Sequence, residues 1–297
     1  MRADDLSIGY EIWARPNLDL EGLYEQVRAA SRLMRTRRWR DFSAVWGTVS
    51  GASILGEAKA YVIYQLASGA VDLPGDLIEL GVYRGGLSFM LGLMQERTGS
   101  SKKVVMCDNF DRGLPAPNRR VDRAYIRGSM TAPIADVRRL RSQLGLGTRC
   151  RLKPGLFSKT LPTLPRDQRF SFAHIDCDLY AGTRDALRYV FPRLSTGAPL
   201  VVDDYYDESH GVMRAVNEFA SRNRLLIHLG IFGQAYVIKG EVPSGVKPRS
   251  IDSRPIYLTT DAARTGPLFL DYLRGTLARK AERLERLGRF IDWCERG

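Results

Sequence analysis

The sequence predicts an α/β protein built on a doubly wound, mostly parallel sheet. Two observations lead to this prediction. Between residues 71 and 240, short apolar runs alternate with segments that carry the helical period, which is typical of such sheets. Most of the runs are almost continuously apolar, as expected for strands that are buried on both faces. The chain is long enough for one large domain with extensions.

The elements of this core follow in order. The predicted strands are 76–80, 103–107, 148–152, 170–175, 199–202, 224–229 and 234–239. The predicted helices between them are 87–97, 134–145, 183–194 and 211–222. Only the four residues GIFG separate the last two strands, which is too short for a parallel crossover, so the last strand is predicted to be antiparallel.

Helical extensions are expected on both sides of the core. Residues 1–70 are predicted to be a mostly helical lid or oligomerisation segment, with one helix over 54–69 that ends on Gly69. Residues 241–297 are predicted to form a linker and a basic amphipathic helix. That helix is expected to pack on its own core or on a partner subunit, with a membrane-surface helix as the alternative. The apolar stripe of this helix is Leu273, Leu277, Ala281, Leu284 and Ile291. Self-association is therefore expected, with a homodimer as the simplest case.

The composition limits the setting and the partners. The net charge is +12, dominated by arginine. Such a charge suits nucleic acid, an anionic cofactor, a nucleotide sugar or an acidic carrier protein, but it also arises from solvated arginines alone. No nucleic-acid-binding signature accompanies it, so no nucleic-acid partner is expected. The four cysteines form no CxxC pair, and no apolar run approaches 18 residues. A reducing, cytoplasmic setting without a signal peptide or membrane span is expected.

Glycines follow the first predicted strand. The stretch LIELGVYRGGLSF places Glu79 at the strand end and then Gly81, before a helix begins. At a first βα turn, glycines let the backbone approach a ligand, although they also simply form turns. Asp108 ends the next strand about 20 residues later, where an acid can bind a ribose. NAD and S-adenosylmethionine both fit this pair. The antiparallel last strand and the looser glycine spacing favour the methyltransferase variant.

Carboxylates end two further strands. Asp176 and Asp178 follow the strand at 170–175, and Asp203 and Asp204 follow the strand at 199–202. The carboxyl ends of parallel strands open into one crevice, so these side chains are expected to converge. Mg²⁺ would relieve their mutual repulsion. The alternative is helix capping, which is weighed equally for Asp178 and for Asp207.

The three histidines divide in the same way. His174 and His228 lie inside apolar runs and are expected in the core. His210 lies in the loop after the double Asp, where it is a candidate general base or substrate contact. Tyr205 and Tyr206 follow the double Asp, and their pattern leaves open whether they shape the loop or hold an acceptor.

The ordered motifs resemble the macrocin O-methyltransferase family (TylF/MycF/NovP-type), which comprises metal-dependent sugar O-methyltransferases. The resemblance covers about residues 45–240. The motifs that carry it are IELGVYRGG, CDNFDRGLPAP, PGLFSKTLP, HIDCDLYAGTRDAL, RLSTGAPLVVDDY and RAVNEF. It implies a Rossmann-like class I methyltransferase fold with S-adenosylmethionine as the methyl donor.

The resemblance also assigns residue roles. Asp176, Asp203 and Asp204 match the metal ligands, with Asp178 as a structural neighbour. The residues that it assigns to S-adenosylmethionine are Ser53, Ile54, Glu79, Gly81, Tyr83, Arg84, Gly85, Gly86, Asp108, Asn109, Phe110, Phe157 and Ser158.

The expected reaction is methylation of a sugar hydroxyl of a glycosylated secondary metabolite, as in antibiotic biosynthesis. Mg²⁺ would acidify the hydroxyl, and either Asp176 or His210 would remove the proton. The sequence departs from the family pattern in the basic stretch 118–128, in the loop that carries His210 and in the C-terminal helix, and such loops set acceptor specificity. A catechol, an amine or a lipid- or carrier-linked glycan therefore remains an alternative acceptor. A non-catalytic, basic nucleic-acid-binding protein is the remaining alternative.

Overall fold

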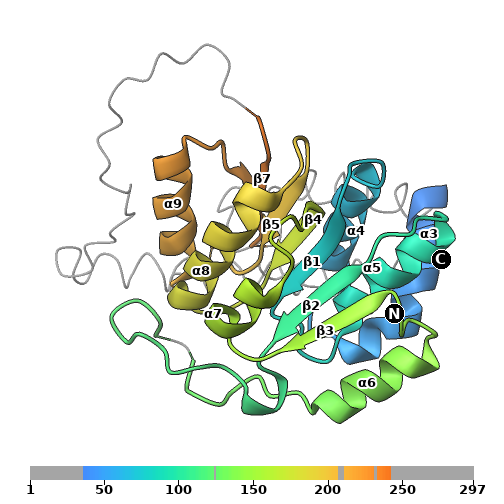
Figure 1. Cartoon of the computed structure of the whole chain (residues 1–297), viewed down its shortest axis with the longest axis horizontal. Helices are drawn as coiled ribbons and strands as arrows, with labels where there is room; N and C mark the ends of the chain where they lie inside the picture. The colour runs from blue at the N-terminus through green and yellow to red at the C-terminus, as the bar shows by residue number, and fades with distance from the viewer. Residues whose placement is uncertain (1–35, 124, 207–210, 231–232, 242–297) are drawn as a thin grey trace, which may run out of the picture. The chain divides into compact units, whose positions relative to one another are not determined.

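A seven-stranded sheet forms the centre of the protein (Figure 1). The computed structural model describes residues 36–123, 125–206, 211–230 and 233–241. The strands are β1 (Asp76–Leu80), β2 (Val104–Asp108), β3 (Cys150–Pro154), β4 (Phe170–Ile175), β5 (Pro199–Val202), β6 (His228–Leu229) and β7 (Ala235–Ile238). Their order across the sheet is β3-β2-β1-β4-β5-β7-β6.

The direction of the strands confirms the predicted fold class. The strands β3, β2, β1, β4 and β5 are parallel to one another, whereas β7 is antiparallel to both β5 and β6. Every residue of β4 and of β5 is buried, in agreement with their almost continuously apolar sequences. The central strands are therefore covered on both faces.

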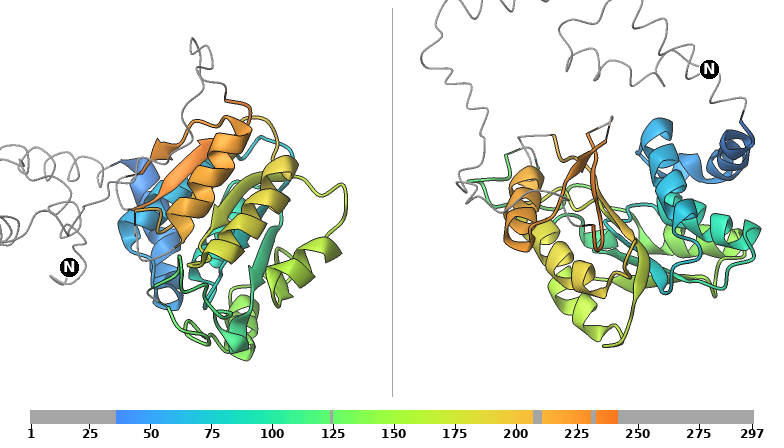
Figure 2. Two further views of the ribbon diagram at one scale, coloured as in Figure 1. Left: turned by 90° about the vertical axis from the view of Figure 1, so that its left-hand side faces the viewer. Right: turned by 90° about the horizontal axis from the view of Figure 1, so that it is seen from above.

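Helices form the two outer layers (Figure 2). Their bounds are α3 (Arg37–Val49), α4 (Glu57–Gly69), α5 (Gly86–Arg97), α6 (Ile134–Gln143), α7 (Phe157–Thr160), α8 (Tyr180–Val190) and α9 (Val212–Asn223). Buried side chains of α3, α4 and α5 share one apolar cluster with one face of the sheet. Those of α8 and α9 share a second cluster with the other face.

The amino-terminal helices are part of this core. An aromatic group joins α3 to α4, since the Trp39 and Tyr61 rings lie 4.7 Å apart and those of Phe42 and Tyr61 lie 5.0 Å apart. The helix expected over 54–69 is present as α4. The predictions for residues 1–35 and for the basic C-terminal helix concern segments outside the described residues.

Helix α4 and strand β3 begin three and two residues later than predicted, and two further elements differ from their predicted bounds for local reasons. Helix α8 begins three residues before the predicted 183 and ends at Val190, where a 3-10 turn with Pro192 follows, because proline has no N–H with which to continue an α-helix. Strand β6 has only two residues instead of the predicted 224–229. Arg224 is the left-handed C-cap of α9, with φ 53°, so the chain is still leaving the helix where the strand was expected.

Within the residues that the structure describes, no helix is both long and apolar enough to cross a lipid bilayer. The β1, β2, β4 and β5 strands all end at one edge of the sheet, and the loops that follow them meet there. A doubly wound sheet binds its ligands at this edge.

Candidate active site

A cavity of about 580 Å³ opens at the carboxyl ends of the parallel strands. Most of the residues predicted to bind cofactor or metal line it. They are Ser53, Ile54, Glu79, Gly81, Tyr83, Asp108, Asn109, Phe157, Ser158, Asp176, Asp203 and Asp204. Four other residues of the predicted set lie beside the cavity but are not among the described residues that line it. These are Arg84, Gly85, Gly86 and Phe110.

Gly81 is required by the close approach of two strand ends. Its φ is 89°, and a Cβ atom at this position would lie 1.7 Å from the carbonyl oxygen of Asp176. Only glycine allows the β1 loop to pass so close to the end of β4. The glycine turn therefore lies directly beside the first acid of the cluster.

Asp108 organises the turn after β1. One oxygen of its carboxylate accepts the backbone N–H groups of Val82 and Tyr83, at 2.6 and 2.8 Å, and the other accepts that of Phe110 at 2.6 Å. Burial raises the pKa of Asp108, and the backbone hydrogen bonds oppose that shift. This carboxylate fixes the loops after β1 and β2 relative to each other and still faces the cavity.

Glu79 is held from both sides beneath the cavity. It is 2% exposed, accepts a hydrogen bond from the Ser88 hydroxyl and lies 3.3 Å from Nδ1 of His174. His174 is fully buried, as predicted. The same prediction is wrong for His228. That side chain is 29% exposed, stacks on Tyr236 and lies 2.5 Å from Glu241, because β6 is the edge strand of the sheet.

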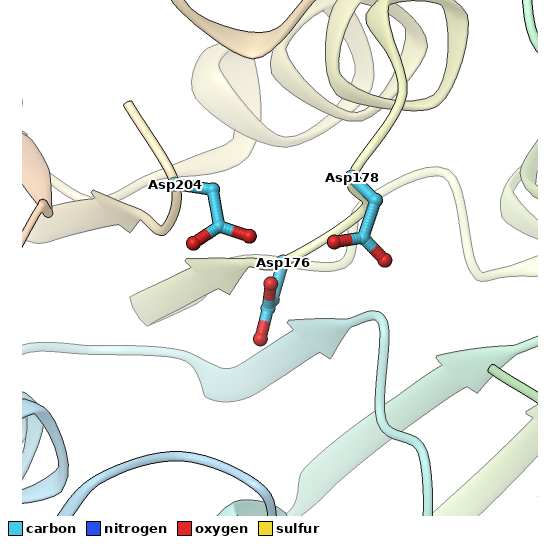
Figure 3. Close-up of side chains that lie close together, drawn as sticks. All are labelled: Asp176, Asp178 and Asp204. Carbon is cyan, nitrogen blue, oxygen red and sulfur yellow. The ribbon is translucent and has the colours of Figure 1, made fainter. Parts of the chain in front are cut away.

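Three carboxylates converge at the ends of β4 and β5. Each of Asp176, Asp178 and Asp204 offers an oxygen atom, and these atoms all lie within 4.8 Å of one another. Figure 3 shows the Asp178 and Asp204 carboxylates on either side of Asp176. Asp178 and Asp204 have φ values of 59° and 54°. Left-handed backbone is costly for residues other than glycine and concentrates at functional sites.

Asp203 lies next to this cluster but has a different partner. Its carboxylate is 2.9 Å from Nζ of Lys59, which also lies 3.4 Å from Asp204. Burial disfavours the charge on Lys59, but Asp203 and Asp204 outweigh burial and raise its pKa. The sequence analysis did not single out Lys59. The available signal is a lysine between Ala58 and Ala60 in a helix that is mostly apolar.

The acids disfavour one another's charge. Burial, followed by the charges of Asp203, Asp178 and Asp204, raises the pKa of Asp176 well above its usual range. Burial and Asp204 raise the pKa of Asp178 to about 7. Burial also raises the pKa of Asp203, against the effect of Lys59. Oxygen donors that repel one another in this way fit a hard divalent cation such as Mg²⁺.

The alternative of helix capping does not describe Asp178. The N–H of Tyr180, at the start of α8, is bonded to Asp122 at 2.8 Å. Asp178 is instead hydrogen-bonded to Tyr125, and its carboxylate faces that of Asp204. Sequence reasoning missed Tyr125, which comes from the 118–128 stretch and lines the cavity.

The two tyrosines after the double Asp have separate environments. The Tyr205 hydroxyl donates to Asn217 at 2.7 Å and its ring is buried, so it shapes the loop. Tyr206 is 39% exposed and lines the cavity. His210 and Asp207 lie outside the described residues.

Known proteins share this sequence pattern. Residues 25–232 match the family model described as Macrocin-O-methyltransferase (TylF). A tetracenomycin-C 4'-O-methyltransferase of Streptomyces olivaceus is 36% identical over 56% of this chain and 65% of its own length. A demethyldecarbamoylnovobiocin O-methyltransferase of Streptomyces niveus is 33% identical over 45% and 54%. A mycinamicin III 3''-O-methyltransferase of Micromonospora griseorubida is 30% identical over 62% and 74%. The chain thus spans less than two thirds of the first two relatives.

Solved structures share the fold. The O-methyltransferase NovP superposes with a TM-score of 0.57 at 25% identity, over 64% of this chain and 83% of that one. The calicheamicin methyltransferase CalS11 gives 0.58 at 19% identity, over 76% and 95%, and supports the fold alone. The sheet therefore has the class I O-methyltransferase architecture.

Proposed function

The chain belongs to the macrocin-O-methyltransferase (TylF) family, and on this premise we propose that it transfers a methyl group from S-adenosylmethionine to a sugar hydroxyl, with Mg²⁺ at the acid cluster. The observation that carries the proposal is the position of the three converging carboxylates in the same cavity as the glycine turn. A site that only bound a nucleoside would not require them.

The cofactor half of the cavity is built by the loops after β1 and β2. Glu79, Gly81 and Asp108 would hold the amino acid and ribose parts of S-adenosylmethionine. Phe157 and Ser158, at the start of α7, would hold its adenine. Gly81 contributes a surface without a side chain, and Asp108 keeps the Tyr83 turn in place.

The metal half is built by the loops after β4 and β5. Asp176 and Asp204 belong both to the cluster and to the set predicted by resemblance, so we propose them as ligands. Asp178 is the third carboxylate of the cluster. Asp203, the third residue of the predicted set, becomes a ligand only if Lys59 leaves it. When bound, S-adenosylmethionine supplies an electrophilic methyl group and Mg²⁺ supplies a Lewis acid that lowers the pKa of a hydroxyl.

The chain's own residues then position the acceptor and take its proton. Asp176 lies next to Gly81, between the two halves of the cavity, so it faces both the cofactor turn and the acid cluster. Burial and the neighbouring acids raise the pKa of Asp176, and a raised pKa makes its carboxylate a stronger base. We propose Asp176 as the base in preference to His210, because Asp176 is placed at the cluster. The rest of the catalytic effect is alignment of the acceptor oxygen with the methyl group.

The proposed acceptor class is based on the names of the three relatives. The three named above act on tetracenomycin, novobiocin and mycinamicin compounds, and the tetracenomycin enzyme's name specifies a rhamnosyl sugar. A glycosylated secondary metabolite is therefore the proposed acceptor. The two adjacent hydroxyls of a catechol would fit the same cluster, so a catechol is the second candidate acceptor. A cytoplasmic homo-oligomer is proposed as the working form.

A direct assay tests the proposal. The full chain is incubated with S-adenosylmethionine and a panel of glycosides, catechols, amines and lipid-linked glycans, and products are identified by mass spectrometry. The expected result is a gain of one methyl group on a glycoside, present with Mg²⁺ and abolished by EDTA. Methylation of catechols alone would change the acceptor class. Full activity in EDTA would remove the metal from the mechanism. Salt-sensitive binding of nucleic acid without affinity for S-adenosylmethionine would replace the proposal altogether.

A further inference from the structure

Asp122 is a buried carboxylate in the basic 118–128 segment. It is 1% exposed. Its Oδ2 accepts the N–H of Asn118 at 2.9 Å, within its own segment. Its Oδ1 accepts the N–H of Tyr180 at 2.8 Å and that of Gly211 at 3.1 Å. One side chain thus joins three stretches that are far apart in the sequence.

Two of these amides lie at helix amino ends. Tyr180 is the first residue of α8, and Gly211 is the N-cap of α9. The N-cap residues themselves cannot cap these helices, because the Leu179 side chain is apolar and Gly211 has no side chain. Asp122 therefore performs the capping role for both helices from outside them, and the positive ends of the two helix dipoles favour its charge.

Gly211 supports the same arrangement independently. A Cβ atom at position 211 would lie 2.4 Å from Cβ of Tyr180 and 2.6 Å from Oδ1 of Asp122. The backbone of Gly211 has φ −71°, which any residue adopts, so the glycine is not required by its own conformation. It is required by the close approach of the carboxylate and α8.

The helices that Asp122 joins follow the acid loops. Helix α8 begins two residues after Asp178, and α9 begins after the loop that starts with Asp204. The Tyr180 hydroxyl also donates to Glu218 of α9 at 2.7 Å, so the two helices are joined on their outer surface as well. A shift of the α8 start would move Asp178, which lies two residues before it. A shift of α9 would move Asn217, which accepts a hydrogen bond at 2.7 Å from the hydroxyl of Tyr205, the neighbour of Asp204.

The same segment carries Tyr125 into the cavity. The base of the loop is closed by backbone bonds, from the N–H of Leu114 to Ser129 at 2.8 Å and from the N–H of Gly128 to Leu114 at 2.9 Å. The Tyr125 hydroxyl is hydrogen-bonded to Asp178. Tyr125 thus contacts the acid cluster at the ends of β4 and β5.

We propose that Asp122 is a positioning residue, which fixes the starts of α8 and α9 and thereby holds Tyr125 and the Asp178 and Asp204 carboxylates in one arrangement at the acceptor side of the site. Tyr125 forms the acceptor-facing wall of that arrangement. The inference rests on the proposed methyl transfer, because it assigns the acceptor side of that reaction.

The test compares Asp122→Ala, Asp122→Asn, Gly211→Ala and Tyr125→Phe with the parent chain. The matched control is Asp76→Asn. Asp76 also joins distant segments, since it accepts the N–H of Lys103 at 2.8 Å and the Gln168 side chain at 3.0 Å, but it lies at the amino end of β1, opposite the site. Three quantities are measured: kcat and KM for the acceptor, the Kd of S-adenosylhomocysteine by calorimetry, and backbone hydrogen exchange.

We expect Asp122→Ala to lower acceptor kcat/KM by about a hundredfold, because small misplacements of reacting groups cost that much. The Kd for S-adenosylhomocysteine should change less than about threefold. A tenfold change would require the loss of an interaction of about 1.4 kcal/mol, and the hydrogen bonds described for Asp122 involve none of the proposed cofactor residues that could supply it. Exchange should rise at 118–128 and at the starts of α8 and α9. Asp122→Asn keeps one acceptor oxygen, so its loss of acceptor kcat/KM should be intermediate. Gly211→Ala should resemble Asp122→Ala. Tyr125→Phe should alter the KM for the acceptor without raising backbone hydrogen exchange.

Unchanged acceptor kinetics in an active Asp122→Ala variant would overturn the inference, as would equal losses in Asp76→Asn. If the parent chain methylates nothing, the proposed function fails instead, and the exchange data still decide whether Asp122 holds the helix starts. If Asp122→Ala does not fold, Asp122→Asn and Gly211→Ala provide the same comparison.

Discussion

The Lys59 ammonium lies 2.9 Å from the Asp203 carboxylate, at a point where the loops after β4 and β5 bring four acids together. Asp203 is 4% exposed, so its charge depends on this lysine. Lys59 belongs to α4 and lies 144 positions before Asp203 in the sequence. The amino-terminal helical layer is thus part of the proposed metal site.

Replacement of Lys59 should destabilise the metal-free protein. In Lys59→Met, the buried Asp203 loses its cation, and we expect the free energy of unfolding in EDTA to fall by about 2 to 3 kcal/mol. The measurement is urea denaturation. The control is Arg139→Met, which breaks the exposed ion pair with Asp136 and should cost less than about 1 kcal/mol. Equal losses in the two variants would show that Asp203 does not depend on Lys59.

The stability of the metal-free protein should fall as pH rises. The pKa of Asp178 is raised from 3.8 to about 7 in the folded protein, so between roughly pH 4 and 7 the folded state holds more protons than the unfolded state. This stabilisation is complete below the unfolded pKa and is lost as pH rises through the folded pKa. Melting temperatures in EDTA at pH 5 and pH 7.5 should show the loss. Asp178→Asn should flatten the difference, and an unchanged slope in that variant would contradict the assignment.

The glycine at position 81 should be irreplaceable. Gly81→Ala places a methyl group against the Asp176 carbonyl oxygen, and it also forces alanine into a left-handed backbone conformation. Gly99→Ala is the matched control, since Gly99 has φ 68° but nothing within 4 Å of the added atom. We expect Gly81→Ala to cost about 3 kcal/mol more than the control in urea denaturation and to weaken binding of S-adenosylhomocysteine. Similar costs would mean that the backbone at Gly81 can move away from β4.

The acids should bind metal in solution. Asp176→Asn and Asp204→Asn should each weaken Mn²⁺ binding, followed by electron paramagnetic resonance, by at least about tenfold. Asp136→Asn, on the exposed face of α6, serves as the control because it removes a carboxylate without touching the cavity. The same affinity in all three variants would exclude the cluster as the binding site.

The sequence was sufficient for the fold and for most of the cavity. The runs that became β1, β4 and β5 are mostly apolar because both faces of the sheet are covered, and this pattern also indicates their ends. Once the strands are parallel, their carboxyl ends share one edge, so Asp108, Asp176 and Asp204 had to lie near one another.

The site residues that could not be predicted from the sequence contact partners that are far away in the sequence. Helix α8 starts at Tyr180 because Asp122 caps it, and no pattern near residue 180 encodes a cap that lies 58 positions earlier. Lys59 looks like any lysine in a helix until α4 packs beside the acids. The sequence fitted Asp178 equally well as a helix cap and as a metal ligand, and only the three-dimensional arrangement shows that its carboxylate faces Asp204.

The most direct measurement is an anomalous diffraction map of crystals grown with Mn²⁺ and S-adenosylhomocysteine. A manganese peak within coordination distance of Asp176 and Asp204, in the cavity that holds the cofactor, is the predicted result. Its third carboxylate ligand would be Asp178 if Lys59 stays on Asp203, and Asp203 if Lys59 has moved away. A fully occupied cofactor with no manganese peak at these carboxylates would contradict the metal site and the mechanism built on it.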